Sequence, residues 1–216
     1  RLHTADGLAA DGAALSTPGF DITGWHPTTV PKTVLAALVD NGVYPDPYFG
    51  VNMTQIPGYQ EGAWLRMADD SPFRSSWWFC MEFNGPAIGE NEQAILYFDG
   101  LNYKANIWLD GEKIAGEDTV QGMFRRFEFN VTKQMFNRPN PHVLAVEIIP
   151  PGLVPDKKYG TKQIEATTGW DDHNPQPPDG NMGLWQPVYL RVQGPVSLRN
   201  PYVETRLDVP GLEEAR

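Results

Sequence analysis

The residues best suited to chemistry lie together in a stretch from 168 to 185 that is rich in Asp, Asn, Trp, Gly and Pro. Carboxylate and amide groups such as Asp172 and Asn174 can fix sugar hydroxyls, while an aromatic ring stacks on the apolar face of a pyranose. Trp170 and Trp185 could supply such a ring, or could instead fill the end of a hydrophobic core. We therefore expect carbohydrate binding here, with simple loop packing as the competing interpretation.

The same stretch is poorly equipped for hydrolysis. A glycosidase needs two carboxyl groups roughly 5–10 Å apart. Asp171 and Asp172 are adjacent, so on an extended segment their side chains would point to opposite sides. The sequence also lacks a Gly-x-Ser-x-Gly motif. We predict no catalytic residue in this chain.

Metal and cofactor sites are not expected either. The four histidines, at positions 3, 26, 142 and 173, are far apart in sequence, and Cys80 stands alone, so no spacing resembles a zinc site. The oxygen-rich cluster at 171–174 could hold a cation, but a hydrogen-bonding surface is the favoured interpretation. Aromatic neighbours predict that Cys80 is a buried, inert thiol.

Composition and charge exclude further classes of function. The 216 residues carry a formal net charge of −10, which argues against non-specific binding to nucleic acid or to an anionic membrane surface. No run of 18 apolar residues is present, so no transmembrane helix is expected. The chain has 21 Gly and 20 Pro, which favours many turns and few long helices.

Extended segments with turn residues between them dominate the chain. Pro31–Gly42 is the one segment with a helical pattern, and Asp110-Gly111 is a hairpin signal between two extended runs. The pattern predicts an all-β antiparallel jelly-roll β-sandwich with one short helix, occupying 1–209, with 210–216 as the start of a linker. The expected strands are an edge strand within 2–15, then Trp77–Phe83, Ala94–Phe98, Lys104–Leu109, Glu112–Ala115, Arg126–Val131, His142–Ile149, Val188–Val192 and Leu198–Leu207.

Several short motifs occur in a fixed order along the chain. They are Thr29–Leu35, Tyr44–Gly50, Trp77–Phe79 with Phe83, Phe98–Gly111, Gly122–Phe124 with Phe127, and Pro177–Trp185. In this order they resemble the N-terminal sugar-binding domain of family 2 glycoside hydrolases. The branch that they most resemble is that of exo-β-glucosaminidases and mannosylglycoprotein endo-β-mannosidases, and the resemblance covers nearly the whole chain.

The resemblance implies a galactose-binding-like fold that is followed, in full-length members, by immunoglobulin-like domains and a TIM barrel with two catalytic Glu. The N-terminal domain would then supply part of the substrate pocket. The family's Asp-Trp-Asn-Pro loop matches Asp172-His173-Asn174-Pro175 here. It implies that Asp172 accepts hydrogen bonds from sugar hydroxyls with support from Asn174. His173 replaces the usual Trp, which puts stacking at that position in doubt.

These inferences predict a non-catalytic domain of a periplasmic or secreted β-glycosidase of exo-β-glucosaminidase or β-mannosidase type. Its partners would be a β-linked glucosamine or mannose oligosaccharide and the immunoglobulin-like and barrel domains of the parent chain, with no cofactor, nucleic acid or membrane. Two alternatives stay open: a free-standing carbohydrate-binding module, and a domain that only packs against the barrel.

Overall fold

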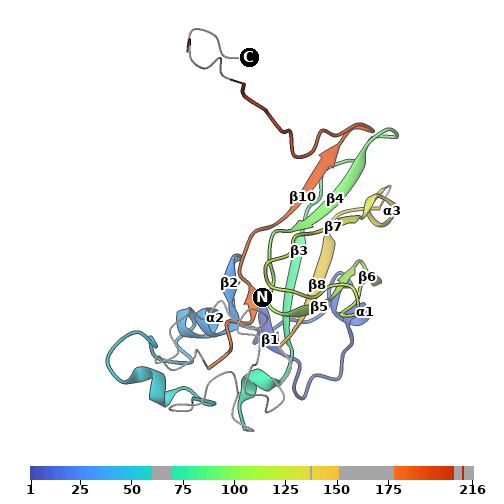
Figure 1. The fold of residues 1–216 in the computed structure, drawn as a ribbon. Helices are drawn as coiled ribbons and strands as arrows, with labels where there is room; N and C mark the ends of the chain where they lie inside the picture. Colours follow the sequence, from blue (N-terminus) through green and yellow to red (C-terminus); the bar gives the residue numbers. More distant parts are fainter. Residues whose placement is uncertain (60–69, 137, 151–177, 207–210, 212–216) are drawn as a thin grey trace.

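The computed structural model describes residues 1–59, 70–136, 138–150, 178–206 and 211. It is built from antiparallel sheets, as the sequence predicts (Figure 1). The larger sheet has five strands in the order β1-β3-β8-β5-β6. Its strands are β1 (Leu2–Thr4), β3 (Trp77–Phe83), β5 (Lys104–Leu109), β6 (Glu112–Ala115) and β8 (His142–Ile149).

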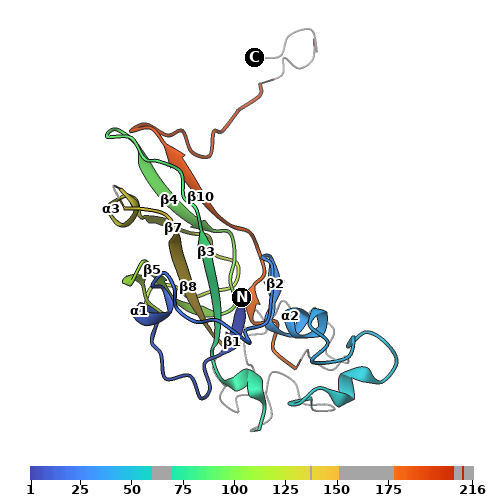
Figure 2. The same cartoon turned by 180° about the vertical axis from the view of Figure 1, so that it is seen from behind.

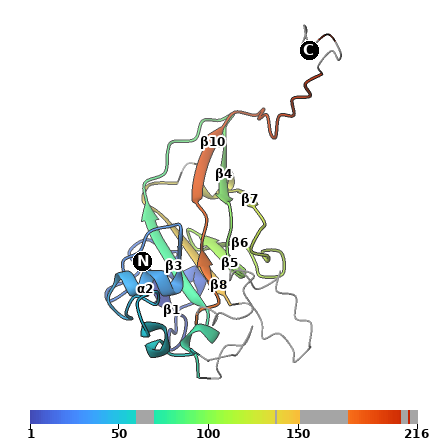
Figure 3. The ribbon, with the colours of Figure 1, turned by 60° about the vertical axis from the view of Figure 1, so that its left-hand side comes forward.

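A three-stranded sheet in the order β10-β4-β7 packs against the larger sheet (Figure 3). Its strands are β4 (Gln93–Phe98), β7 (Phe127–Asn130) and β10 (Val188–Gln193). A small third sheet pairs β2 (Lys32–Thr33) with β9 (Gly183–Leu184) at one end of the sandwich. Seven of the predicted strands are thus confirmed as β3 to β8 and β10, and an edge strand occupies the start of the predicted 2–15 segment.

Three predictions need correction. The helix α2 spans Val34–Asp40 and begins after its cap Thr33, not at the predicted Pro31. Lys32 and Thr33 instead form the short strand β2. Two further helices of four residues occur, α1 (Gly12–Leu15) and α3 (Thr132–Met135), in addition to the 3₁₀ turns η1 (Asn52–Gln55) and η2 (Pro72–Arg74). Residues 198–206, predicted as strand, have no regular secondary structure.

The aromatic run of β3 is buried on both faces of its sheet. Trp77 and Phe79 belong to the main core between the sheets, whereas Trp78 and Cys80 belong to a second core that includes Leu15 of α1. Helix α1 lies beside β5 and β8 of the larger sheet (Figure 2). Gly12 in α1 is required there, because a Cβ atom at that position would lie 2.2 Å from the Trp108 ring. This double burial explains why the strand reads as a continuous apolar run rather than an alternating one.

The β5–β6 hairpin turns at Asp110-Gly111, as its sequence indicates. Both residues have positive φ, 51° and 83°, which is the backbone that a two-residue hairpin of this twist requires. The hairpin is also attached to β8, because His142 Nδ1 lies 2.6 Å from Asp110 Oδ2. The turn is therefore stabilised both by residues that accept positive φ and by the contact between Asp110 and His142.

Candidate functional site

The predicted binding residues Asp172, His173 and Asn174 lie outside the described residues, as does Trp170. The structure does describe the segment that continues the same motif, residues 178–186, and the groups to which this segment is attached. These attachments define one end of the sandwich, where the small sheet β2–β9 and the N-terminus of α2 meet (Figure 1).

Asp179 is the centre of this attachment. Its carboxylate is fully buried and accepts hydrogen bonds from the Leu35 amide (2.9 Å) and the Asn181 amide (2.9 Å). The Val34 amide donates to the Met182 carbonyl (2.8 Å), and the Ala36 amide donates to the Thr33 hydroxyl oxygen (3.2 Å).

The first turn of a helix leaves such amides without helical partners, so these contacts complete the turn. They also bind residues 178–182 to α2.

Burial raises the pKa of Asp179 to about 6. Desolvation of the carboxylate is the largest effect, and it outweighs the hydrogen bonds from the Leu35 and Asn181 amides and from the Thr33 side chain. Asp179 is therefore a carboxyl group that is shielded from solvent and joins residues 178–182 to α2.

Asn102 attaches the same segment from the other side. Its side-chain amide donates to the Gly180 carbonyl (2.9 Å) and the Asn181 carbonyl (3.0 Å). Its backbone exchanges two hydrogen bonds of 2.9 Å with Gly183. A Cβ atom on Gly183 would lie 2.6 Å from the Lys32 carbonyl oxygen, so only glycine fits between the two neighbours. Residues 178–184 are consequently held in one geometry from both sides.

An aromatic pair lies beside this segment. The indole N–H of Trp185 donates to the Met123 carbonyl (3.1 Å), and the Trp185 ring meets Phe124 edge to face at 5.8 Å. Trp185 is half-buried, while Phe124 is exposed. Trp185 thus helps to close the end of the sandwich, and Phe124 is the ring that faces solvent there.

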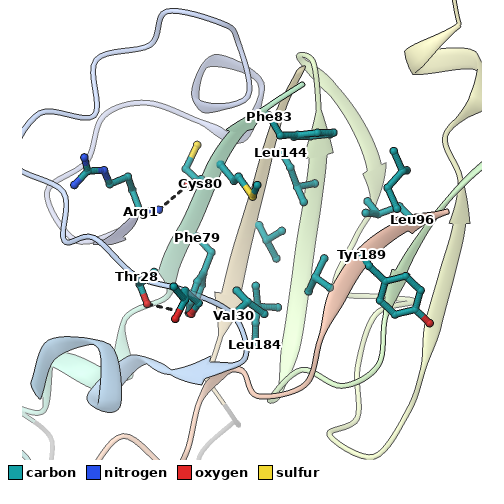
Figure 4. A pocket seen from close by; sticks show the side chains of 15 residues that line it. Arg1, Thr28, Val30, Phe79, Cys80, Phe83, Leu96, Leu144, Leu184 and Tyr189 are labelled. Carbon is teal, nitrogen blue, oxygen red and sulfur yellow. Dashed lines mark hydrogen bonds between the residues drawn. The ribbon is translucent and has the colours of Figure 1, made fainter. Parts of the chain in front are cut away.

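A separate cavity of about 530 Å³ lies between the two main sheets. Its walls are mostly apolar, with Phe79 and Leu144 on the larger sheet, Leu96 and Tyr189 on the smaller one, and Val30 and Leu184 at its lower end (Figure 4). Among the described residues that line it, no carboxylate or amide side chain is present. The polar side chains of its lining are those of Arg1, Thr28, Thr29 and Tyr189, so the cavity lacks the carboxylate and amide groups expected of the sugar site at 171–174.

Other candidate chemistries can be judged within the described part of the chain. There, no group of three or more His, Cys, Asp or Glu could hold a metal ion. No described helix has the length and apolar character to cross a bilayer. Cys80 is buried, as predicted; its thiol donates to the Leu15 carbonyl (3.3 Å), and burial raises its pKa.

Asp179 and Asn102 lie within the sequence motifs, but no motif predicts a role for either residue. The contact between Asp179 and Leu35 joins residues 144 positions apart, which no local pattern reveals. The sequence around Asp179 contains Asp and Asn residues among glycines, and this pattern indicates a turn. It does not indicate which distant helix the turn will cap.

Residues 9–186 match the family described as glycosyl hydrolase 2 galactose-binding domain-like. The chain belongs to this family. It is 34% identical over 203 residues to an exo-β-D-glucosaminidase of Streptomyces avermitilis, covering 94% of this chain and 20% of that protein. It is 30% identical over 213 residues to a mannosylglycoprotein endo-β-mannosidase of Lilium longiflorum, covering 91% and 21%.

Solved structures agree with the sequence relatives. The crystal structure of Amycolatopsis orientalis exo-chitosanase CsxA matches with a TM-score of 0.73 and 27% identity, covering 96% of this chain and 21% of that one. A variant of that enzyme has been solved in complex with PNP-β-D-glucosamine. This galactose-binding-like domain therefore spans about a fifth of the length of the glycosidases to which it is similar.

Proposed function

We propose that this chain is a non-catalytic, sugar-facing domain of a longer β-glycosidase that hydrolyses O-glycosidic bonds of the exo-β-glucosaminidase or β-mannosidase type. The observation that carries the proposal is the match to glycosidases over more than nine-tenths of this chain but only a fifth of theirs. The catalytic carboxylates would then belong to another domain of the parent protein.

Within that enzyme, the loop at 171–175 contributes to the substrate pocket. Asp172 accepts hydrogen bonds from sugar hydroxyls, Asn174 supports it, and His173 lies between them. The firm attachment of the next segment through Asp179 and Asn102 supports this assignment, because a binding loop needs a rigid base to be pre-organised.

The proposed partners follow from the same relatives. They are a β-linked glucosamine or mannose oligosaccharide and the immunoglobulin-like and barrel domains of the parent chain, with no nucleic acid and no membrane. We further propose that the enzyme works in the periplasm or outside the cell.

The substitution Asp172→Ala in the longer enzyme tests the role of the loop. Loss of a charged hydrogen bond to substrate should lower kcat/KM by about tenfold to a hundredfold, while the melting temperature stays the same. Asp171→Ala is the matched control, because the neighbouring carboxylate is expected to point the other way. Unchanged kinetics in Asp172→Ala would favour a domain that only packs against the barrel.

Titration of the 216-residue chain with chitosan or mannan oligosaccharides tests the alternative of a free-standing binding module. A domain that provides only part of a pocket should bind weakly or not at all. Tight binding by this chain alone, measured by calorimetry, would favour the module instead.

A further inference from the structure

Phe124 is a large aromatic side chain that is held in position although it is 68% exposed. Its ring meets the Trp185 ring edge to face at 5.8 Å. The indole N–H of Trp185 donates to the carbonyl of Met123, the residue before Phe124, at 3.1 Å, and Met123 is buried. The Phe124 ring is therefore supported on one side and open to solvent on the other.

The backbone on both sides of Phe124 is also fixed. The Gly122 amide donates to the Tyr103 carbonyl (2.9 Å), and the Arg125 amide donates to the Gly122 carbonyl (3.4 Å). The Arg125 guanidinium lies over the Phe127 ring, 5.0 Å from its centroid. An exposed ring on such a turn is pre-organised, so a ligand that stacks on it does not have to order the protein first.

This aromatic turn, residues 122–125, is attached to the same elements as the candidate sugar-binding stretch. Trp185 is the last residue of the stretch 168–185, in which the binding residues are predicted. Asn102 donates to the carbonyls of residues 180 and 181 in that stretch, and the next residue, Tyr103, accepts the amide that anchors the aromatic turn. One group of contacts thus holds both the stretch and the turn in place.

The groups around Phe124 suit a sugar better than an apolar protein surface. Arg125 and Arg126 follow Phe124 directly and are both exposed, and the Arg126 Nε lies 3.7 Å from Asp99 Oδ1. Charged groups of this kind can bind sugar hydroxyls, whereas an apolar interface would remove them from water at a free-energy cost. A pyranose matches this surface, because it has an apolar C–H face surrounded by hydroxyl groups.

We infer that Phe124 stacks on the pyranose unit on the leaving-group side of the bond that the parent enzyme cleaves. The sugar whose anomeric carbon reacts must be enclosed and shielded from water, which a ring as exposed as Phe124 cannot achieve. Such a ring suits the next unit instead. The inference rests on the proposed function and adds a second sugar contact to it. Trp185, which the sequence offers for stacking, supports Phe124 from behind.

Kinetics of the longer enzyme test which sugar unit Phe124 contacts. Phe124→Ala should raise KM for a β-linked glucosamine or mannose trisaccharide about threefold to tenfold and leave kcat unchanged, because stacking is equal in the bound substrate and the transition state. The matching β-glycosyl fluoride has no ring in its leaving group, so its KM and kcat should not change. An unchanged KM for the trisaccharide, or an equal rise for the fluoride, would overturn the inference.

Two further variants separate sugar stacking from packing against another domain. Phe124→Tyr keeps an aromatic face and should retain the wild-type KM for the trisaccharide. Phe124→Leu keeps apolar volume without a ring and should behave as Phe124→Ala does. The melting temperature of the longer enzyme should fall by less than about 4 °C in Phe124→Ala, since one exposed aromatic contact is lost. A larger fall, or wild-type kinetics in Phe124→Leu, would assign the ring to a domain interface and overturn the inference.

Nuclear magnetic resonance of the 216-residue chain gives a readout without turnover. With labelled phenylalanine rings, the Phe124 resonances should shift when the trisaccharide is added at millimolar concentration. The Phe49 resonances should not shift, and Phe49 is the matched control because it is also exposed, at 75%, in the loop after α2. Equal shifts of both rings, or no shift of Phe124, would overturn the inference.

Failure of this inference is distinct from failure of the proposed function. If the longer protein cleaves no glycoside, the proposed function fails, and the resonance shift of Phe124 still decides whether a sugar stacks there. If Asp172→Ala lowers kcat/KM for both the trisaccharide and the fluoride while Phe124→Ala changes neither, the pocket role stands and only the role of Phe124 fails.

Discussion

Two buried carboxylates hold the two ends of this sandwich in different ways. Asp110 lies in the β5–β6 turn, with one oxygen 2.6 Å from His142 Nδ1 and the other accepting from the Val143 amide (2.8 Å). Asp179 lies at the opposite end and accepts from amides and a hydroxyl, with no cationic partner among the described residues. The Asp110 carboxylate shares its site with an imidazole, whereas the Asp179 carboxylate is held by two backbone amides and the Thr33 side chain.

The difference shows what each end of the domain needs. A hairpin is local, and its buried ion pair or hydrogen bond fixes the register between β5, β6 and β8. The far end must hold residues 178–184 against a helix that is distant in sequence, so its carboxylate caps amides from both segments. We expect the two sites to respond differently to substitution and to pH.

Removal of the Asp110 partner should have the largest effect. His142→Ala leaves a carboxylate that is only 7% exposed with a single amide donor, and should lower the free energy of unfolding by about 3–5 kcal/mol. Urea denaturation of the 216-residue chain measures this. Arg138→Ala breaks a more exposed pair with Glu112 and should cost less than about 1 kcal/mol. A similar loss of unfolding free energy in both variants would contradict the idea that the buried contact matters more than the exposed ion pair.

Removal of the carboxylate at the other end should cost somewhat less. Asp179→Ala leaves the Leu35 and Asn181 amides without acceptors, and should lower the free energy of unfolding by about 2–4 kcal/mol. Asp46→Ala is the control, because Asp46 accepts from the Tyr48 amide at an exposed position. A loss in the control as large as in Asp179→Ala would mean that burial of the acceptor is unimportant.

The smallest expected effect is a pH dependence specific to Asp179. The pKa of Asp179 is about 6 in the folded chain, above its ordinary value of 3.8, so the folded state binds this proton more tightly than the unfolded state. The contribution of the Asp179 proton to the free energy of unfolding is therefore fully present below about pH 4 and is lost as the pH rises through 6. Between pH 5 and pH 7 the loss should be about 1 kcal/mol.

Urea denaturation of wild type and Asp179→Asn at both pH values isolates this contribution. The variant has no carboxyl group at position 179, so its stability should change less between the two pH values. An identical pH dependence in both proteins would show that another group is responsible.

Much of the fold follows from local patterns that the sequence displays. Alternation and aromatic runs predicted β3 to β8 and β10, because apolar periodicity reflects which face of a strand is buried. Asp110-Gly111 predicted its hairpin, since few residue pairs accept positive φ at both positions. The start of α2 was predicted three residues too early, because the pairing of β2 with β9 competes for Lys32 and Thr33.

The predicted segment Leu198–Leu207 shows the limit of such patterns. Periodicity indicates a strand, but only the fold shows that no neighbouring strand is supplied by the described residues. The site residues Asp172, His173 and Asn174 stay predictions, whereas the carboxylate that anchors the next segment emerged only from the structure.

The amino-acid sequence by itself determined most of the strands, the sharp hairpin turn and the membership of a glycosidase-associated family, because these depend on neighbouring residues and ordered motifs. The tertiary structure decided which Asp is buried and which glycine allows another backbone to approach closely. Those properties depend on segments that meet in space from distant positions, so desolvation and packing fix them only after the chain has folded.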